Sequence, residues 1–346
     1  MACRVAAKRW ITVVLLLSAC FGCGVSENKR VISNGASSAP RLYQIEVREK
    51  WGFINNAGLP VIKPQFDSER MFTEGLASVE LGKKWGFIDT TGRIVVIPRF
   101  DYLDALSEGL AQAKLGDKWA YIDRAGQVVF SSPFDVHGDF THGLALVSLG
   151  GKWGFINKSG RIAISLQFDG GLFGFSEGLA AVKLGERWGY IDKTGHYVIN
   201  PQFGLAGEFY EGLAWVEKDR KFGYINNAGK IMIDPQFDDA ADFSEGLAAV
   251  KLGERWGFIN KAGHSVINPQ FDHSQDFYEG LASVELGGKW GFIDKTGRIA
   301  INPQFDGYNL RNRYETSFND GLAPVRLGIK LGYIDKTGRF VWNPQS

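Results

Sequence analysis

Cysteine, histidine and methionine are scarce in this sequence, and neither sign of charge is in excess. Its 346 residues include three Cys, none of them after residue 23, so disulfides cannot hold the rest of the chain together. Lys and Arg number 39 and Asp and Glu 38, which argues against nonspecific binding to nucleic acid or to an anionic membrane surface. Hydrophobic residues make up 45 %, which excludes general disorder and predicts a packed core.

The first residues have the composition of an export signal. A basic start precedes a ten-residue apolar run at residues 10–19, whereas a membrane-spanning helix needs about 20 apolar residues. This combination predicts a signal peptide at residues 1–19. Residues 24–40 are polar and small and end in proline, which predicts a flexible tether within the segment 20–41.

The apolar run ends in Leu17-Ser18-Ala19-Cys20, which resembles the lipobox of bacterial lipoproteins. The resemblance implies cleavage before Cys20, a diacylglycerol on its sulfur and an acylated amino terminus that binds membrane lipid. Phe21 rather than aspartate follows, and by resemblance to Gram-negative sorting this favours the outer membrane. We therefore expect an extracytoplasmic, membrane-anchored lipoprotein; an ordinary signal peptide cut nearby is the alternative.

From residue 42 onward, one unit is repeated nine times. An aromatic-Gly-aromatic-Ile core recurs at spacings of 34, 34, 34, 35, 34, 34, 34 and 41 residues, with Leu nine positions before it and Gly seven after it. The cores begin at Trp51, Trp85, Trp119, Trp153, Trp188, Phe222, Trp256, Trp290 and Leu331. The predicted units are 42–66, 76–100, 110–134, 144–168, 179–203, 213–237, 247–271, 281–305 and 322–346 of a β domain spanning 42–346.

The sequence of each unit predicts three strands, and the eighth unit, residues 281–305, serves as the example. Residues 281–286 alternate in polarity, and Gly287-Gly288 is a two-residue hairpin signal. Residues 290–294 are aromatic and β-branched, and the stretch from Asp294 to Gly297 fits a type I turn closed by a bulge. A third strand follows at residues 298–305, and the link to the next unit reads as a polar loop or short helical turn with one apolar anchor.

We expect an all-β tandem array of nine three-stranded antiparallel meanders. One meander cannot bury both of its faces, so the units must stack. The aromatic column is the predicted contact between units, worth at most about 5 kcal/mol per buried indole, and the glycine after it leaves room for a neighbouring ring or backbone. An open, superhelical, solenoid-like stack is favoured because the units are whole, and a closed propeller-like ring is the alternative.

These residues resemble the WG-repeat (KWG) family of bacterial proteins, whose motif is Lys-Trp-Gly-Phe-Ile-Asp followed by a Gly turn and a Pro-x-Phe strand end. The main departures are Ala120 for Gly, Phe222 and Leu331 for Trp, and Leu166 for Pro. The resemblance implies a tandem β-repeat that mediates binding and carries no enzymatic activity.

No residue pattern is typical of a catalytic or metal site. No two of the five His lie at metal-ligand spacing, so we expect neither a metal nor a cofactor. His196 and His264 occupy a solvated turn position. An acidic residue precedes each Gly-Leu pair except in the fourth unit, where His142 stands, and these equivalent copies favour a structural ladder. The ladder could face the column of basic residues before each core, and independent solvated charges are the alternative. Such surface ion pairs contribute about 0–1 kcal/mol each.

The predicted function is a noncatalytic cell-envelope protein that binds protein or glycan partners through its repeat surface. The alternative, an envelope glycan-acting hydrolase or lytic enzyme, needs an acid or nucleophile that breaks the repeat symmetry, and we find none in the sequence. Trp rings open to solvent would instead stack on sugars, although burial between units is the preferred reading.

One link interrupts the period. The loop between Asp306 and Asp320 is seven residues longer than its counterparts and contains Tyr308, Arg311, Arg313 and Tyr314, residue types that are common at contact sites. We predict that these four residues bind a partner; a tolerated insertion is the alternative.

Overall fold

The computed structural model describes residues 41–172, 174–307 and 316–343. The chain divides into two compact units, residues 1–36 and 37–346, and all described residues belong to the second. Every element in these ranges is a β-strand. The same ranges contain no helix with the length and apolar character that spanning a bilayer requires.

The strands fall into four classes by their position in the sheets. The innermost strands are β4 (Ser68–Glu69), β8 (Tyr102–Leu103), β12 (Val136–Thr141), β16 (Gly170–Gly171), β20 (Leu205–Ala206), β24 (Asp239–Ala240) and β28 (His273–Tyr278). The second strands are β1 (Tyr43–Val47), β5 (Leu76–Leu81), β9 (Leu110–Leu115), β13 (Leu144–Leu149), β17 (Ala180–Leu184), β21 (Leu213–Lys218), β25 (Leu247–Leu252), β29 (Leu281–Leu286) and β32 (Leu322–Leu327). The third strands are β2 (Lys50–Ile54), β6 (Lys84–Asp89), β10 (Lys118–Asp123), β14 (Lys152–Asn157), β18 (Arg187–Ile191), β22 (Lys221–Asn226), β26 (Arg255–Asn260), β30 (Lys289–Asp294) and β33 (Lys330–Asp335). The outer strands are β3 (Pro60–Phe66), β7 (Ile94–Phe100), β11 (Val128–Ser132), β15 (Ile162–Phe168), β19 (Tyr197–Phe203), β23 (Ile231–Phe237), β27 (Ser265–Phe271), β31 (Ile299–Asp306) and β34 (Phe340–Trp342).

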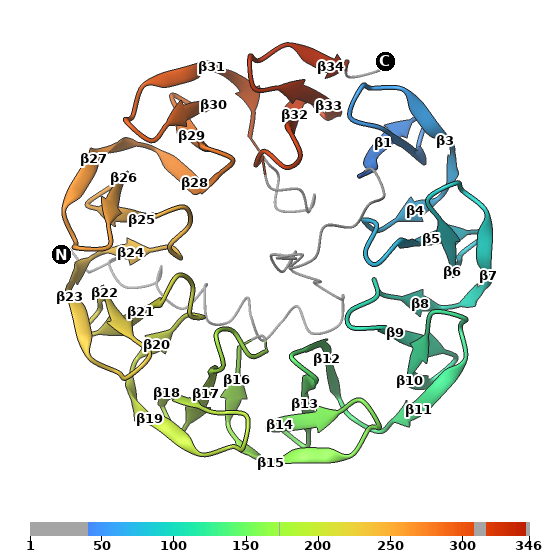
Figure 1. The fold of residues 1–346 in the computed structure, drawn as a ribbon, viewed down its shortest axis with the longest axis horizontal. Coiled ribbons are helices and arrows are strands. Elements are labelled where there is room, and N and C mark those ends of the chain that lie inside the picture. Colours follow the sequence, from blue (N-terminus) through green and yellow to red (C-terminus); the bar gives the residue numbers. More distant parts are fainter. Residues whose placement is uncertain (1–40, 173, 308–315, 344–346) are drawn as a thin grey trace, which may run out of the picture. The chain divides into compact units, whose positions relative to one another are not determined.

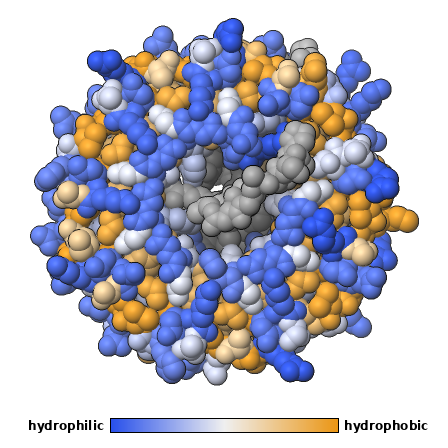
Figure 2. Space-filling view, in the orientation of Figure 1, coloured by the Kyte–Doolittle hydropathy of each residue, from blue (hydrophilic) through white to orange (hydrophobic). Residues whose placement is uncertain are grey.

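These strands form nine antiparallel sheets arranged as the blades of a ring (Figure 1). Blades 2 to 8 have four strands each, and among the described residues blades 1 and 9 have three. In blades 1 to 7 the outer strand leads to the innermost strand of the next blade, and these innermost strands lie toward the centre (Figure 1). Figure 2 shows a hollow at the centre of one face, bordered mostly by hydrophilic residues.

The prediction of three-stranded units in an open stack is wrong. The link that we expected to be a loop or helical turn forms the innermost strand of the next blade. In blade 2, Ser68 pairs with Glu80 and Glu69 pairs with Val79. The apolar anchor of the link is buried as expected, for example Phe209 at 1 % and Phe243 at 0 % exposure.

The ring closes by contacts between blades 9 and 1, and in the described residues these blades share no strand. The Tyr43 hydroxyl donates to the carbonyl oxygens of Asn319 and Asp320, at 3.0 Å each. The rings of Tyr43 and Tyr333 meet edge to face at 5.4 Å between centroids. The closed ring, which the sequence left as the alternative, is therefore the observed arrangement.

Each blade packs a face of large side chains against a face of smaller ones on the next blade. Period-two alternation sends neighbouring residues of a strand to opposite faces, as with Phe87 and Ile88 in β6. The core between blades 2 and 3 combines Leu76, Phe87, Val96 and Phe100 of one blade with Leu103, Leu106, Ala111, Ala113 and Ile122 of the other. Nine such clusters fill the nine junctions, the closing one included.

The turns follow the geometry expected from the sequence. Gly287 and Gly288 have φ of 60° and 77°, as a type I′ hairpin requires. Gly297 has φ of 84°, and its N–H donates to the Asp294 carbonyl at 2.9 Å. A Cβ on Gly297 would also lie 3.2 Å from the Ile267 side chain of the preceding blade, so this turn contacts the neighbouring blade.

The glycine after each aromatic residue accommodates the outer strand of its own blade. A Cβ on Gly154 would lie 2.6 Å from the Ile164 carbonyl oxygen, because the outer strand changes register there. In blade 3, Ala120 takes this position, and it pairs with Ser131 in regular register. Alanine therefore replaces glycine in the blade whose outer strand does not approach this position closely.

We predict that Gly154→Ala destabilises the protein by about 1–3 kcal/mol, because its Cβ must displace backbone rather than a flexible side chain. The reciprocal change Ala120→Gly is the control and should cost about 0.5–1 kcal/mol through chain entropy alone. Urea unfolding followed by fluorescence and circular dichroism would measure both. Equal losses for the two variants would refute the close-approach argument.

Candidate functional site

The aromatic column lies at the junctions between blades. Trp188 and Leu331 are buried, at 8 % and 5 % exposure, and Trp51, Trp85, Trp119, Trp153, Phe222, Trp256 and Trp290 are half-buried. Trp85, for example, packs on the core shared by blades 2 and 3. Among the other predicted site residues, Cys20 and the loop residues Tyr308, Arg311, Arg313 and Tyr314 lie outside the described residues.

Two rows of polar contacts join the blades, one on each side of the disc. The hairpins between second and third strands, such as Gly82-Lys83, lie at one end of the strands, and we call this side the hairpin face. The turns that contain the acid column, such as Glu74-Gly75, lie at the other end, which we call the turn face. The basic and acidic columns thus lie on opposite faces and do not pair with each other, which was one of the two arrangements that the sequence left open.

On the hairpin face, the basic column pairs with aspartates that follow the outer strands. Asp101 shows the arrangement: its Oδ1 accepts from Lys84 Nζ of blade 2 at 2.5 Å, and its Oδ2 accepts the Gly116 N–H of blade 3 at 2.7 Å. One carboxylate therefore bridges two blades. The same double contact is made by Asp67, Asp101, Asp169, Asp238, Asp272 and Asp306.

On the turn face, the acid column also bridges neighbouring blades. Glu108 Oε2 accepts the Gly143 N–H at 2.9 Å and lies 3.1 Å from Lys158 Nζ, and both partners belong to the next blade. The column residues have φ near 50°, including Glu108 at 52° and His142 at 54°, because they begin type I′ turns. The acid column is thus a structural ladder, with partners that the sequence did not identify.

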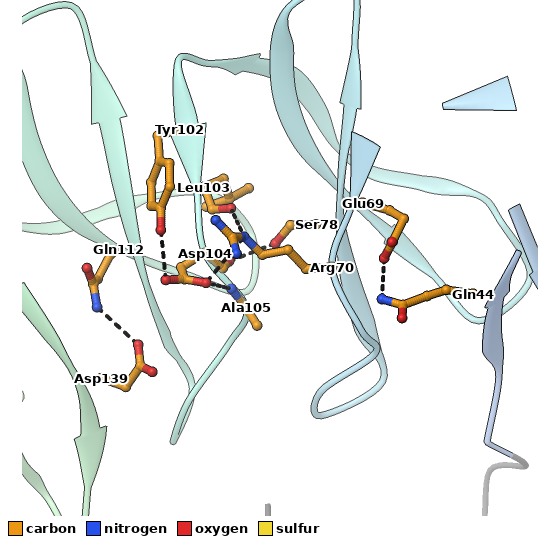
Figure 3. Close-up of polar contacts among 10 residues, drawn as sticks. All are labelled: Gln44, Glu69, Arg70, Ser78, Tyr102, Leu103, Asp104, Ala105, Gln112 and Asp139. Carbon is orange, nitrogen blue, oxygen red and sulfur yellow. Dashed lines mark hydrogen bonds and ion pairs between the residues drawn. The ribbon is translucent and has the colours of Figure 1, made fainter. Parts of the chain in front are cut away.

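A run of polar pairs near the centre breaks the symmetry of blades 1 to 4 (Figure 3). Gln44 of blade 1 donates to Glu69 of blade 2, and Gln112 Nε2 of blade 3 donates to Asp139 Oδ1 of blade 4 at 3.0 Å. Between these pairs lies an ion pair that joins blades 2 and 3. Each pair thus crosses one junction.

The ion pair is buried and multiply hydrogen-bonded. Arg70 Nε lies 3.3 Å from Asp104 Oδ1, and the two side chains are 10 % and 8 % exposed. The Asp104 carboxylate also accepts the Tyr102 hydroxyl at 3.1 Å and the Ala105 N–H at 2.9 Å. The Arg70 guanidinium lies 5.0 Å from the Tyr102 ring centroid. Removing one partner alone would leave an uncompensated buried charge, which typically costs about 3–5 kcal/mol.

The sequence analysis did not predict this polar cluster, although one position of the repeat indicates it. The position two residues after each unit's first Leu is Gln44, Ser78 and Gln112 in blades 1 to 3, Leu146, Ala181, Trp215 and Ala249 in blades 4 to 7, and Ser283 and Pro324 in blades 8 and 9, so glutamine occurs there only in blades 1 and 3. Asp104 stands where the other repeats have no acid, so the statement that no acid breaks the repeat symmetry is wrong. The hydrogen bonds already made by Asp104 suit a group that fixes the order of the blades better than a general acid or base.

The histidines occupy separate positions. His137 stacks on Trp119 with 4.8 Å between ring centroids, and burial lowers the pKa of its imidazole to about 4. His142 replaces the turn-face acid and contacts the Phe175 carbonyl oxygen at 3.0 Å. His196 and His264 lie in the predicted turn position. Their backbone N–H groups donate to the side chains that begin the turns, Asp192 and Asn260. Within the described part of the chain, no three His, Cys, Asp or Glu residues are grouped as metal ligands.

The fold and its repeated bridges define a nine-bladed β-propeller. The profile of the WG containing repeat matches residues 51–85, 85–119, 119–153, 153–188, 188–222, 222–256, 256–290 and 290–328. The chain belongs to the WG-repeat family, and its β-repeat fold suggests a binding or scaffold role.

A solved structure with a TM-score above 0.5 supports the fold alone. The crystal structure of a eukaryotic initiation factor is similar with a TM-score of 0.62 and 12 % identity, over 88 % of this chain and 95 % of that chain. Hsv2p of Kluyveromyces lactis is similar with a TM-score of 0.41 and 9 % identity, over 63 % of this chain and 89 % of that one. The comparison with curated proteins found no match.

Because of the bridging aspartates, we predict that the folded protein loses stability in acid. Hydrogen bonds from Lys152 and from the Gly185 N–H lower the pKa of Asp169, so the folded state favours the carboxylate. This stabilisation is complete above the unfolded pKa of about 3.9 and is lost as the pH falls through the lower folded pKa. Asp169→Asn should lower the Tm at pH 7, and its Tm should fall less than that of the parent between pH 4 and 2.

The control is Asp234→Asn, because Asp234 is exposed on β23 and has no ion pair in the described structure. Its thermal unfolding should follow the parent at every pH. If Asp169→Asn also follows the parent, the bridge contributes nothing to stability.

Proposed function

We propose that this protein is a noncatalytic lipoprotein of the cell envelope that binds a protein partner through the hairpin face. The observation that carries the proposal is a row of exposed leucines on that face. They precede the hairpins and are between 41 % and 55 % exposed: Leu81, Leu115, Leu149, Leu184, Leu252, Leu286 and Leu327. Repeated apolar side chains on one side of a disc are typical of a contact surface.

The row of exposed leucines on the hairpin face favours a protein partner over a glycan. Sugar recognition by stacking needs open aromatic rings, whereas the aromatic column is buried or half-buried between blades. Each leucine is paired across the hairpin with a basic residue, as Leu149 is with Lys152. Beside Leu81, Leu149, Leu252 and Leu286 this basic residue also pairs with a bridging aspartate. Apolar side chains beside charged residues resemble the core and rim of a protein interface.

The described part of the chain begins at the turn face. Strand β1 starts at the turn face, where Arg41 Nη1 donates to Asn319 Oδ1 at 2.6 Å, and it runs toward the hairpin face. Fully extended, residues 20–41 would reach about 70 Å. Such a tether would anchor the domain through Cys20 without fixing which face is turned toward the membrane.

The anchor is tested by Cys20→Ala, with Cys23→Ala as the control. We expect the first variant to leave the membrane fraction and the second to stay there, because only Cys20 lies in the lipobox-like sequence. Cell fractionation and acyl labelling would measure this. Retention of Cys20→Ala in the membrane would contradict lipid anchoring.

The binding face is tested with a Leu115→Ser, Leu149→Ser and Leu184→Ser triple variant. Crosslinking in intact envelopes should trap much less partner than it does with the parent protein, because three contacts are removed at exposed positions. Leu59→Ser is the control, since Leu59 is 62 % exposed on the turn face. Undiminished crosslinking by the triple variant, or peptidoglycan turnover by the purified 41–346 fragment, would overturn the proposal.

A further inference from the structure

The junction between blades 4 and 5 differs from its counterparts on the turn face. At the preceding junction, Glu108 Oε2 accepts the Gly143 N–H at 2.9 Å and lies 3.1 Å from Lys158 Nζ. A glycine N–H and an ammonium of the next blade thus form a carboxylate site. Three later junctions repeat both contacts: Glu211 with Gly246 and Lys261, Glu245 with Gly280 and Lys295, and Glu279 with Gly321 and Lys336.

Both donors are present in blade 5, but no carboxylate bridges them. Gly178 corresponds to Gly143 and has φ of 87° against 83°, so the two turns present the N–H alike. Lys193 corresponds to Lys158, since each is the second residue of the turn before an outer strand. Among the described residues, Lys193 makes no ion pair and the Gly178 N–H has no acceptor. Glu177 beside it accepts an N–H of blade 6 instead.

His142 of blade 4 stands where the other blades have the acid. Its backbone is equivalent, with φ of 54° against 52° for Glu108. The Phe175 carbonyl oxygen of blade 5 lies 3.0 Å from His142 Nδ1, and because a carbonyl only accepts, this nitrogen carries a proton. The ring is therefore held by blade 5 and supplies no acceptor to Gly178 or Lys193 in the described structure.

One acid precedes Lys193 in the chain and leaves the site available. Asp192 begins the same turn and accepts hydrogen bonds from within it. Asp294 begins the corresponding turn of blade 8, where Lys295 still lies 3.1 Å from the carboxylate of Glu245. An aspartate in this position is thus compatible with a carboxylate on the lysine.

We propose that the Gly178 N–H and the Lys193 ammonium bind the carboxylate of an acidic side chain from a partner protein. This carboxylate takes the place that Glu108 takes at the preceding junction, with one oxygen accepting from both donors. Because His142 and Lys193 are exposed, the site encloses too little of a small molecule to hold it firmly. The ligand therefore belongs to a larger partner. The site lies on the face opposite the leucine row and goes beyond the proposed function.

Acetate is the probe, titrated into the isotope-labelled full-length protein at pH 7 and constant ionic strength. The backbone N–H resonance of Gly178 should move downfield and saturate with a Kd of about 10–100 mM, as one exposed charge-assisted contact predicts. The Gly143 resonance is the internal control, because Glu108 already holds that N–H. An unresponsive Gly178, or an equal response at Gly143, would overturn the proposal.

Three variants test the donors and the place of the missing acid. Lys193→Met should weaken acetate binding at Gly178 about tenfold, as the loss of one charged hydrogen bond would. His142→Glu should supply the carboxylate from within the chain, abolish the acetate response and raise the Tm. Glu108→His should transfer the site, so that Gly143 responds. The same spectra verify folding, and an undiminished response in folded Lys193→Met or His142→Glu contradicts the assignment.

Zero-length crosslinking identifies the source of the carboxylate. A carbodiimide joins a carboxylate to an amine that it contacts, so cells that produce the full-length protein should yield Lys193 coupled to an acidic residue of another protein, located by mass spectrometry. Lys158 is the matched control and should couple to Glu108 within the chain. No adduct on Lys193, or an adduct of a small free acid, would refute the partner-protein assignment. The triple leucine variant should keep the acetate response, so the two proposals fail separately.

Discussion

The fold depends on each blade burying a face of large side chains against the smaller face of its neighbour. A single sheet of three or four strands leaves both faces exposed, so a blade buries both faces only between two neighbours. Phe87 and Ile88 show how period-two alternation supplies both faces from adjacent residues of one strand. Nine copies satisfy this requirement for every blade, because the last blade covers the first.

Polar contacts add direction and spacing to this packing. The aspartates of the hairpin face and the acids of the turn face each join a residue of one blade to a backbone N–H of the next. Because these groups are solvent-exposed, each pair contributes little free energy. Together they fix the rotation between neighbouring blades at both ends of the strands. The buried Arg70–Asp104 pair adds specificity, since it fits one junction and matches blades 2 and 3 in order.

The sequence predicted local structure well and closure poorly. The hairpin at Gly287-Gly288 and the turn at Gly297 were predictable, because backbone geometry restricts those positions to few residue types. The innermost strands were not, because pairings as short as Gly170–Gly171 leave no periodicity to detect. Closure depends on contacts such as Tyr43 with Asn319, which lie 276 residues apart and carry no repeat signature. The polar cluster was visible as a column at Gln44, Ser78 and Gln112, but which groups pair required the order of the blades.

Closure through side chains has a consequence for how the molecule is made. During synthesis, the blades can assemble one after another from the amino-terminal end, since each needs the one before it. The surface of blade 1 that carries Tyr43 and Ile45 must wait for the last blade, so a partly synthesised arc displays it to solvent. That growing arc is the stage at which the nascent protein is most exposed to chaperones, proteases and association with other arcs.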